Sequence, residues 1–278
     1  MTAVAVIGLG IMGGPMAANL GRAGYEVIGV RRSDSVGRAV SQADVVLTVL
    51  PDSPDVEAVA SGEDGIIAHA KPGSVWIDSS TIRPDVSVRL AKAAADKGIR
   101  AVDAPVSGGE AGAVEGTLSI MVGGAAEDFE AAKPVLDVVG STVVHVGPSG
   151  SGQTVKAANQ LIVAGTIELV AESIVFLEAH GVDTEAAVRV LAGGLAGNRI
   201  LDRKADGMLA REFQPGFRVD LHHKDLGIVT SAAREAGVAI PLGAAVAQLM
   251  GALRQQGHGS LDHSALLLLV EQLSGQAR

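Results

Sequence analysis

A glycine-rich turn near the start of the chain restricts its possible folds more than any other feature. Residues 8–13 read Gly-Leu-Gly-Ile-Met-Gly, after an apolar run (3–8) that predicts a strand and before a segment (12–23) that predicts a helix. In this context the first glycine permits a tight turn, the second lets a pyrophosphate approach, and the third allows close helix packing. The turn predicts a dinucleotide site formed by Gly8, Gly10, Ile11, Met12 and Gly13. The alternative is an ordinary glycine-rich turn of an α/β protein.

Aliphatic runs and helical stretches alternate through the first half of the chain, and the second half is helical. Continuous apolar runs indicate strands buried on both faces, and their alternation with helices indicates a parallel sheet. Strands are predicted at 3–8, 25–30, 45–50, 74–78, 100–103, 118–122 and 143–146. Later helices are predicted at 153–180, 184–192, 224–236, 243–256 and 263–273. We therefore expect an α/β Rossmann-type doubly wound parallel sheet in a domain of residues 1–150, followed by an all-α domain of residues 151–278.

The end of the second predicted strand indicates which dinucleotide is bound. NAD sites usually place an acidic residue there to bind the ribose hydroxyl. Here the strand ends in Arg31 and Arg32, and the first carboxylate is Asp34. Guanidinium groups bind phosphate in a bidentate manner, so we expect NADP(H) to be preferred, with NAD(H) possible. The alternative is that both arginines are solvated surface residues.

Composition excludes several classes of function. The 278 residues carry a net charge of −9, which disfavours binding to the nucleic-acid backbone. The absence of Cys excludes thiol nucleophiles, disulfides and cysteine-ligated metals. The adjacent pair His222–His223 would converge poorly on a metal, so no metal site is expected. Charges interrupt the most apolar long stretch and no basic leader is visible, so a cytoplasmic protein without a membrane partner is expected.

Two polar segments are candidates for chemistry. Lys156 and Asn159 share one face of a predicted helix that is otherwise aliphatic. An inward ammonium could give a proton to a carbonyl oxygen as hydride arrives on carbon, although a lysine whose stem only covers apolar surface fits equally well. Residues 103–109 (DAPVSGG) end a strand in a loop whose amides and Ser107 hydroxyl could hold a carboxylate. The alternative for that loop is an ordinary turn.

Together these segments resemble the β-hydroxyacid dehydrogenase family, which includes 3-hydroxyisobutyrate dehydrogenase. The matching segments are GLGIMGGPMAANL near the N-terminus, DAPVSGGEAGAVEGTLSIMVGG from Asp103 and GSGQTVKAANQLIVAG from Gly150. Within the family, KAANQLIVA, FQPGFRVDLHHKDL and DHSAL are most similar to a semialdehyde reductase. The similarity covers nearly the whole chain, and its motifs occur in order.

The resemblance implies roles for individual residues. Lys156 would be the catalytic lysine, and Ser107, Gly108 and Gly109 would hold the substrate carboxylate with help from Asn159. Leu50, Pro51, Thr81 and Lys224 would contact the cofactor, and Asp225 would support the substrate site. From the residues alone, Lys224 and Asp225 indicate a surface charge pair. The family also implies a homodimer or homotetramer formed through the helical domain.

One segment departs from the family pattern. Only the twelve residues 33–44 lie between Arg32 and the next predicted strand, which is enough for a single short helix. The family normally has a helix, a strand and a second helix there. The adenine side of the dinucleotide site would therefore lack a wall, whereas the catalytic motifs are complete.

The resulting functional hypothesis is an NAD(P)H-dependent reductase of a small β-oxo acid, with Lys156 as the proton donor. The alternatives are a dehydrogenase or reductase of another semialdehyde, an imine reductase, and a non-catalytic protein that binds NADPH. Imine reductases resemble this family but usually lack the lysine, so Lys156 argues against that alternative.

Overall fold

The computed structural model describes residues 1–276 and separates into two compact units. The first unit is Met1–Lys156, and the second begins at Ala157. The division falls inside one long helix, α8 (Ser151–Ala179). The predicted fold is confirmed: a sheet dominated by parallel strands, of Rossmann type, precedes a helical part of the chain.

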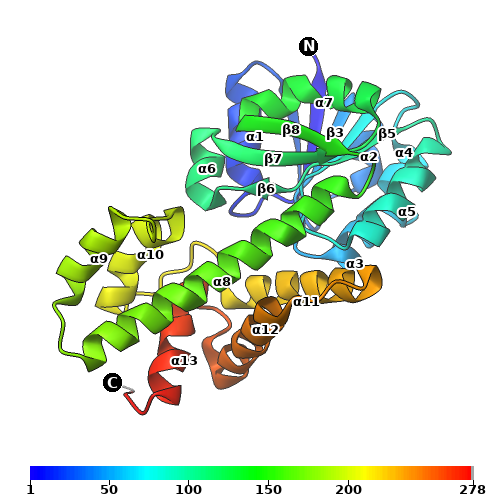
Figure 1. The fold of residues 1–278 in the computed structure, drawn as a ribbon. Helices are drawn as coiled ribbons and strands as arrows, with labels where there is room; N and C mark the ends of the chain where they lie inside the picture. Colours follow the sequence, from blue (N-terminus) through cyan, green and yellow to red (C-terminus); the bar gives the residue numbers. More distant parts are fainter. Residues whose placement is uncertain (277–278) are drawn as a thin grey trace. The chain divides into compact units, whose positions relative to one another are not determined.

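The first unit is built on an eight-stranded sheet (Figure 1). Its order is β2-β1-β3-β4-β5-β7-β6, with β8 paired to β7. The strands are β1 (Ala3–Ile7), β2 (Glu26–Val30), β3 (Val45–Thr48), β4 (Val75–Asp78), β5 (Arg100–Asp103), β6 (Val106–Ser107), β7 (Leu118–Gly123) and β8 (Gly140–Gly147). All residues of β1, β3 and β4 are buried, as continuous aliphatic runs predict.

Helices cover both faces of this sheet. One face packs against α1 (Gly13–Arg22), α6 (Gly109–Glu115) and α7 (Ala126–Val139), and the other against α2 (Val36–Val40), α3 (Ser53–Ser61), α4 (Ile66–His69) and α5 (Pro84–Ala95). Alternation along β1 divides its side chains between the faces: Val4 and Val6 join the first core, and Ala5 and Ile7 join the second. Two aliphatic cores therefore enclose the sheet.

The later strands depart from the parallel arrangement that the sequence predicts. Strands β1 to β5 pair in parallel, but β7 runs antiparallel to both β5 and β6. The cause is the short strand β6, which follows β5 after two residues and pairs Ser107 with Ser119 of β7. A parallel pairing needs a long crossover before the strand, whereas the chain from β6 returns through the seven-residue helix α6.

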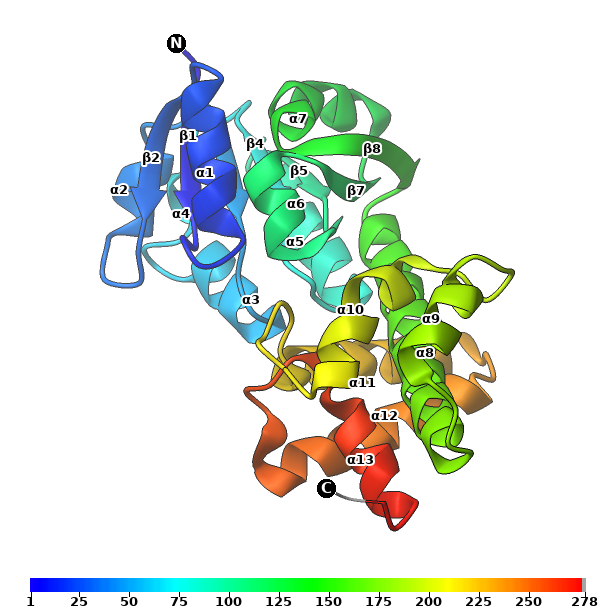
Figure 2. The same ribbon diagram turned by 90° about the vertical axis from the view of Figure 1, so that its left-hand side faces the viewer.

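The segment between β2 and β3 forms one five-residue helix, α2, as its length predicts. Ser35 begins this helix, since its hydroxyl accepts from the amide of Arg38. The sheet order then ends at β2, so β2 is an edge strand (Figure 2). Its burial is correspondingly low, with only Val30 fully buried.

The regular elements of the second unit, among its described residues, are helices. After α8, its helices are α9 (Thr184–Ala192), α10 (Arg199–Ala210), α11 (Val219–Ala236), α12 (Pro241–Leu253), a π-helical turn (Arg254–His258), a 3₁₀ turn (His263–Ala265) and α13 (Leu266–Leu273). Helix α9 matches its predicted bounds, α11 begins five residues earlier than predicted, and α10 was not predicted.

Helix α8 supplies the central apolar surface of this core. Among the described residues it is the one helix that is long and apolar enough to cross a membrane. Its side chains Ala164, Ile167, Ala171 and Ile174 are almost completely buried in the core of the second unit. This is the environment of a core helix in a globular domain.

Candidate active site

The turn between β1 and α1 is tightly packed at two of its three glycines. Gly8 has φ of +99°, a backbone conformation that favours glycine. A Cβ on Gly8 would lie 2.3 Å from the carbonyl oxygen of Val49, and one on Gly13 would lie 1.9 Å from that of Gly8. Strand, turn and helix therefore approach at distances that only glycine allows.

Gly10 differs, because a Cβ there would meet no atom within 4 Å. The space beside it is open, and Ile11 next to it is exposed. Helix α1 begins at this point with no side-chain cap at Met12 and no acidic residue in its first turn. Uncapped backbone amides at a helix start are suited to a phosphate. The turn thus fits the pyrophosphate of a dinucleotide, as the motif predicts.

Neighbouring strand ends adjoin this turn. The parallel strands β1, β3 and β4 all end at the same edge of the sheet. Leu50, after β3, lies against Gly8, and its amide donates to the Ser80 hydroxyl at 2.9 Å. Pro51 is exposed and Thr81 is partly exposed. Leu50, Pro51 and Thr81 therefore line the same edge of the sheet as the glycine turn.

The two arginines after β2 are both exposed. Asp34 folds back on this loop, where its carboxylate accepts from the backbone amide of Arg31 at 2.8 Å. That bond keeps the nearest carboxylate at the strand end and leaves both guanidinium groups in solvent. The loop can present positive charge to a phosphate, but its β2 side is the open edge of the sheet.

Lys156 is buried, with 6% of its surface exposed, on the second turn of α8. Its Nζ donates to the carbonyl oxygen of Val106 at 2.8 Å. Val106 directly precedes Ser107, Gly108 and Gly109, and the two glycines have φ of +139° and +66°. The structure therefore brings the predicted catalytic lysine and the predicted carboxylate loop together.

Two buried residues that the sequence interpretation missed fix the start of α8. Asp103 accepts from the amides of Gly150 at 2.7 Å and Gln153 at 2.9 Å, and burial raises the pKa of its carboxyl. Gln153 accepts from the Ile82 amide at 3.1 Å and donates to the Ser80 carbonyl at 2.8 Å. Gln153 therefore holds both neighbours of Thr81 beside the helix that carries Lys156.

Burial also affects Asp78, which is paired with Asp103 in the β4–β5 register. Its Oδ1 accepts from the Thr48 hydroxyl at 2.7 Å and the Ser80 amide at 3.1 Å, whereas Oδ2 has no hydrogen-bond partner. Desolvation raises the pKa of Asp78 to about 6, even though the bonds from Ser80 and Thr48 oppose that shift. Asp78 therefore fixes the backbone of residues 78–81 through its hydrogen bond with the Ser80 amide, although burial of the carboxyl removes its hydration.

The second unit contains the remaining predicted site residues in one network. Gln160 is 4% exposed; its Oε1 accepts from Asn159 at 2.7 Å and its Nε2 donates to Asp225 at 2.6 Å. Lys224 forms an ion pair with Asp225, with Nζ 2.7 Å from Oδ1. Asp225 is almost fully buried, so this is no surface charge pair. Gln160, which the sequence interpretation missed, links Asn159 to Asp225 and through it to Lys224.

Known protein families and individual proteins match this chain over nearly its whole length. Family models match residues 3–147 to the NAD binding domain of 6-phosphogluconate dehydrogenase, and residues 150–270 to the NAD-binding of NADP-dependent 3-hydroxyisobutyrate dehydrogenase. The 2-hydroxy-3-oxopropionate reductase of Escherichia coli is 39% identical over 279 residues, covering 95% of this chain and 96% of that protein. The 3-hydroxyisobutyrate dehydrogenase of Pseudomonas aeruginosa is 36% identical over 290 residues, covering 96% and 97% respectively.

A solved structure shows the same fold. Mycobacterium tuberculosis 3-hydroxyisobutyrate dehydrogenase, determined with L-serine, has a TM-score of 0.87 at 33% identity and covers 96% of this chain and 98% of its own. The chain therefore belongs to the β-hydroxyacid dehydrogenase family and is an NAD(P)-dependent oxidoreductase that acts on the hydroxyl group of hydroxy acids.

Proposed function

We propose that the protein reduces a small β-oxo acid, with tartronate semialdehyde as substrate and glycerate as product. The observation that carries this proposal is the buried ammonium of Lys156, held 2.8 Å from the carbonyl oxygen that precedes the Ser107–Gly109 loop. A proton donor and a carboxylate-binding loop in contact suit a substrate with a carbonyl close to its carboxylate. The 39% identity to a protein named 2-hydroxy-3-oxopropionate reductase supports this choice of substrate.

The reaction needs one hydride and one proton. The nicotinamide, when bound, supplies the hydride to the aldehyde carbon, and the carbonyl double bond becomes a C–O single bond. Lys156 donates a proton to the oxygen as negative charge develops there. In the opposite direction, the same amine accepts the hydroxyl proton. Its hydrogen bond to the Val106 carbonyl holds the ammonium in place, so the lysine side chain need not move during the proton transfer.

The Ser107–Gly109 loop would orient the substrate. The positive φ angles of Gly108 and Gly109 turn the loop backbone sharply, and its amides with the Ser107 hydroxyl can bind a carboxylate. Binding the carboxylate at a fixed distance from Lys156 places the substrate carbonyl where it can be attacked. Such orientation can supply a large part of an enzyme's rate enhancement. Asn159 and Asp225 would contribute from the network of the second unit.

For the cofactor, we propose NADP(H) in preference to NAD(H). Gly8, Gly10, Ile11, Met12 and Gly13 would hold the pyrophosphate, with Leu50, Pro51, Thr81 and Lys224 nearer the nicotinamide. The exposed Arg31 and Arg32 would bind the 2′-phosphate. Because β2 is the edge strand, a bound adenine would have protein on fewer sides than in a sheet that continues past β2. The contact with the 2′-phosphate would therefore contribute a larger share of the cofactor affinity.

The experiment is a panel of small semialdehydes assayed with NADPH and with NADH. We expect the highest kcat/KM for tartronate semialdehyde with NADPH. Lys156→Ala should lower kcat by about three orders of magnitude and leave the NADPH dissociation constant unchanged, with Lys92→Ala on the exposed side of α5 as a control that keeps full activity. Turnover of Lys156→Ala near that of the unaltered protein would defeat the proposal, and a clear preference for NADH would defeat its cofactor part.

We propose further that the protein acts in the cytoplasm as a homodimer or homotetramer, without a nucleic-acid or membrane partner. The net charge of −9 supports the absence of nucleic acid. The exposed apolar side chains Val155, Ile162, Leu169 and Phe176 on α8 support self-association.

A further inference from the structure

A short segment near the C-terminus, residues 261–264, is bound to the chain just before α11. The amide of His263 donates to the Phe217 carbonyl at 2.9 Å, and the amide of Val219 donates to the Leu261 carbonyl at 2.9 Å. We call residues 261–264 the clasp. Because Val219 begins α11, the clasp holds the first turn of the helix that carries Lys224 and Asp225.

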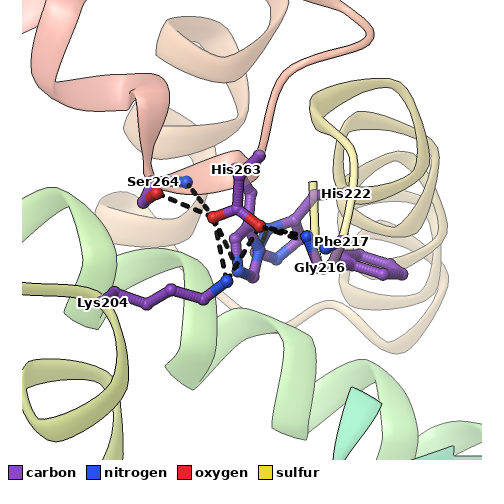
Figure 3. A network of polar contacts seen from close by, with 7 residues as sticks. Lys204, Gly216, Phe217, His222, His263 and Ser264 are labelled. Carbon is purple, nitrogen blue, oxygen red and sulfur yellow. Dashed lines mark hydrogen bonds and ion pairs between the residues drawn. The ribbon is translucent and has the colours of Figure 1, made fainter. Parts of the chain in front are cut away.

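Asp262 anchors the clasp, and its partners Lys204, Gly216, Phe217 and Ser264 are labelled in Figure 3. Its carboxylate is 2% exposed and accepts from the Lys204 ammonium at 2.8 and 2.9 Å, the amides of Gly216 and Phe217, and the hydroxyl and amide of Ser264. Desolvation raises the pKa of Asp262, but the charge of His263 and the bonds from Lys204 and Ser264 outweigh it and lower the pKa to about 2. The anchor therefore stays ionised at any pH at which an enzyme would be assayed.

Next to this anchor, two buried histidines face each other (Figure 3). His222 is 0% and His263 5% exposed, and their Nδ1 atoms lie 2.9 Å apart. The edge of Phe217 packs against both rings, with ring centroids 5.6 Å and 5.5 Å away. Two ring nitrogens at this distance share one hydrogen, so one histidine donates and the other accepts.

The surroundings decide which histidine donates. The Nε2 of His222 lies 3.4 Å from the Gln160 carbonyl oxygen, which can only accept, so Nε2 carries the hydrogen. A neutral His222 then has an unprotonated Nδ1, and His263 donates to it. A proton added at Nδ1 of His222 would set two N–H groups against each other. The contact between the rings therefore requires His222 to be neutral.

This pair connects the clasp to the proposed substrate residues. His222 contacts the backbone of Gln160, and the Gln160 side chain holds both Asn159 and Asp225. Two charged groups adjoin the pair among the described residues: Asp262 in the clasp, whose Oδ1 lies 3.9 Å from the Nε2 of His263, and Lys204 on α10, which pairs with Asp262. Helix α8 contributes the neutral Gln160.

We propose that His222 and His263 are positioning residues, which hold Gln160 so that its amide fixes Asn159 and Asp225 for the substrate, and that they do so only while His222 is neutral. This inference rests on the proposed function for its kinetic consequence. Loss of the hydrogen bond between the two rings should loosen the hold of His222 on Gln160. The KM for the semialdehyde should rise, while kcat, which depends on Lys156, should change less.

Two substitutions of His263 separate positioning from mere support of the fold. In His263→Asn the amide nitrogen lies where Nδ1 was and still donates to His222, so KM should stay within about twofold of the unaltered protein. His263→Leu removes the donor, and the KM for the semialdehyde should rise about tenfold at pH 7.5, the equivalent of one lost buried hydrogen bond.

A second readout does not depend on turnover. In ¹⁵N-labelled protein, histidine NMR at pH 7.5 should show His222 as the Nε2–H tautomer, and the side-chain amide signals of Asn159 and Gln160 should shift in His263→Leu but not in His263→Asn. An Nδ1–H or doubly protonated His222 at pH 7.5 would overturn the proposal, as would equal KM values for the two variants. If no semialdehyde is turned over, the proposed function fails, and the NMR result still decides whether the pair holds Gln160.

Discussion

Gln153 and Lys156 lie in the first two turns of α8, and Asp103 lies at the end of β5; each is buried with a different partner. Lys156 is bound to the Val106 carbonyl, Asp103 to the amides that begin α8, and Gln153 to both sides of Thr81. The large majority of buried polar groups in folded proteins are hydrogen-bonded. The same bonds that satisfy them place the ammonium against the Ser107–Gly109 loop, so stability and site geometry depend on the same residues.

Single residues also mark the limit of prediction from sequence. Lys156 and the glycine turn could be found because their neighbours in sequence reveal their context. Asp103, Gln153 and Gln160 could not, because each has a partner that lies 47 to 73 residues away. The burial of Lys224 and Asp225 was missed for the same reason, since a charged pair on a helix indicates a surface until its tertiary neighbours are known.

Asp78 allows a test of buried charge at the residue scale. Its raised pKa of about 6 means that the folded protein binds a proton more tightly than the unfolded chain. This tighter proton binding therefore contributes fully to the free energy of unfolding below pH 4, and the contribution is lost as pH rises through 6. Asp78→Asn keeps the acceptor for Thr48 and Ser80 and removes the charge. We expect it to be more stable than the unaltered protein at pH 8, by at most about 3 kcal/mol.

Urea unfolding at pH 8 and at pH 4.5 measures this difference. The advantage of Asp78→Asn should shrink towards zero at the lower pH, where the native carboxyl is protonated as well. Asp85→Asn is the control: Asp85 is exposed and paired with Arg83, which lowers its pKa, so its removal should not stabilise at pH 8. A gap that stays constant with pH would show that the Asp78 charge is not its cause.

At the scale of elements, the parallel part of the fold follows from the aliphatic runs, and the exceptions have local causes. Strand β6 has only two residues, too few for any periodic pattern, yet it determines the antiparallel direction of β7. Helix α10 was missed because its charged residues hide an apolar stripe at Leu201, Ala205 and Met208. That stripe has helical spacing and could have been recognised from the sequence.

The connection between β1 and α1 combines a folding role and a binding role, and these can be separated by substitution. Gly13→Ala places a methyl group 1.9 Å from the Gly8 carbonyl oxygen, so we expect destabilisation of about 3 kcal/mol or failure to fold. Gly10→Ala meets no protein atom. Its stability should stay within about 0.5 kcal/mol of the unaltered protein, but NADPH should bind at least about tenfold more weakly, because the methyl group occupies the pyrophosphate space.

Thermal unfolding without cofactor and fluorescence titration with NADPH give the two quantities for each variant. The prediction is that stability and NADPH affinity change independently of each other. It is wrong if Gly10→Ala loses stability in proportion to binding, or if it binds NADPH with unchanged affinity.

At the scale of the whole molecule, the outward side of α8 carries an apolar stripe with a repeat of seven. Val155, Ile162, Leu169 and Phe176 are all exposed, with Ile162 at 68% and Phe176 at 64%. Seven residues correspond to nearly two helical turns, so the four side chains lie along one face. A contiguous apolar stripe of this kind is unusual on a helix surface that faces solvent, and it supports the proposed self-association.

We propose that a second copy of the chain packs on this stripe. If two α8 helices pack antiparallel around a two-fold axis between Gly165 and Thr166, Val155 lies opposite the partner's Phe176 and Ile162 opposite the partner's Leu169. The same axis sets Ala158 opposite Ser173, and a Cβ at Gly165 would meet nothing within 4 Å, so the helices can approach closely at the centre. A two-fold interface must be complementary to itself, and this stripe satisfies that requirement.

Charge substitutions test both the interface and its register. With Ile162→Glu and Leu169→Glu together, four like charges meet across the axis, and we expect a monomer at micromolar concentration. With Ile162→Glu and Leu169→Lys together, each new glutamate faces a new lysine, so the dimer should persist, although more weakly than in the unaltered protein. Sedimentation equilibrium distinguishes these outcomes. Equal association of the two double variants would exclude this register, and a monomeric unaltered protein at 100 µM, taken as about the upper limit for a specific dimer, would exclude the interface itself.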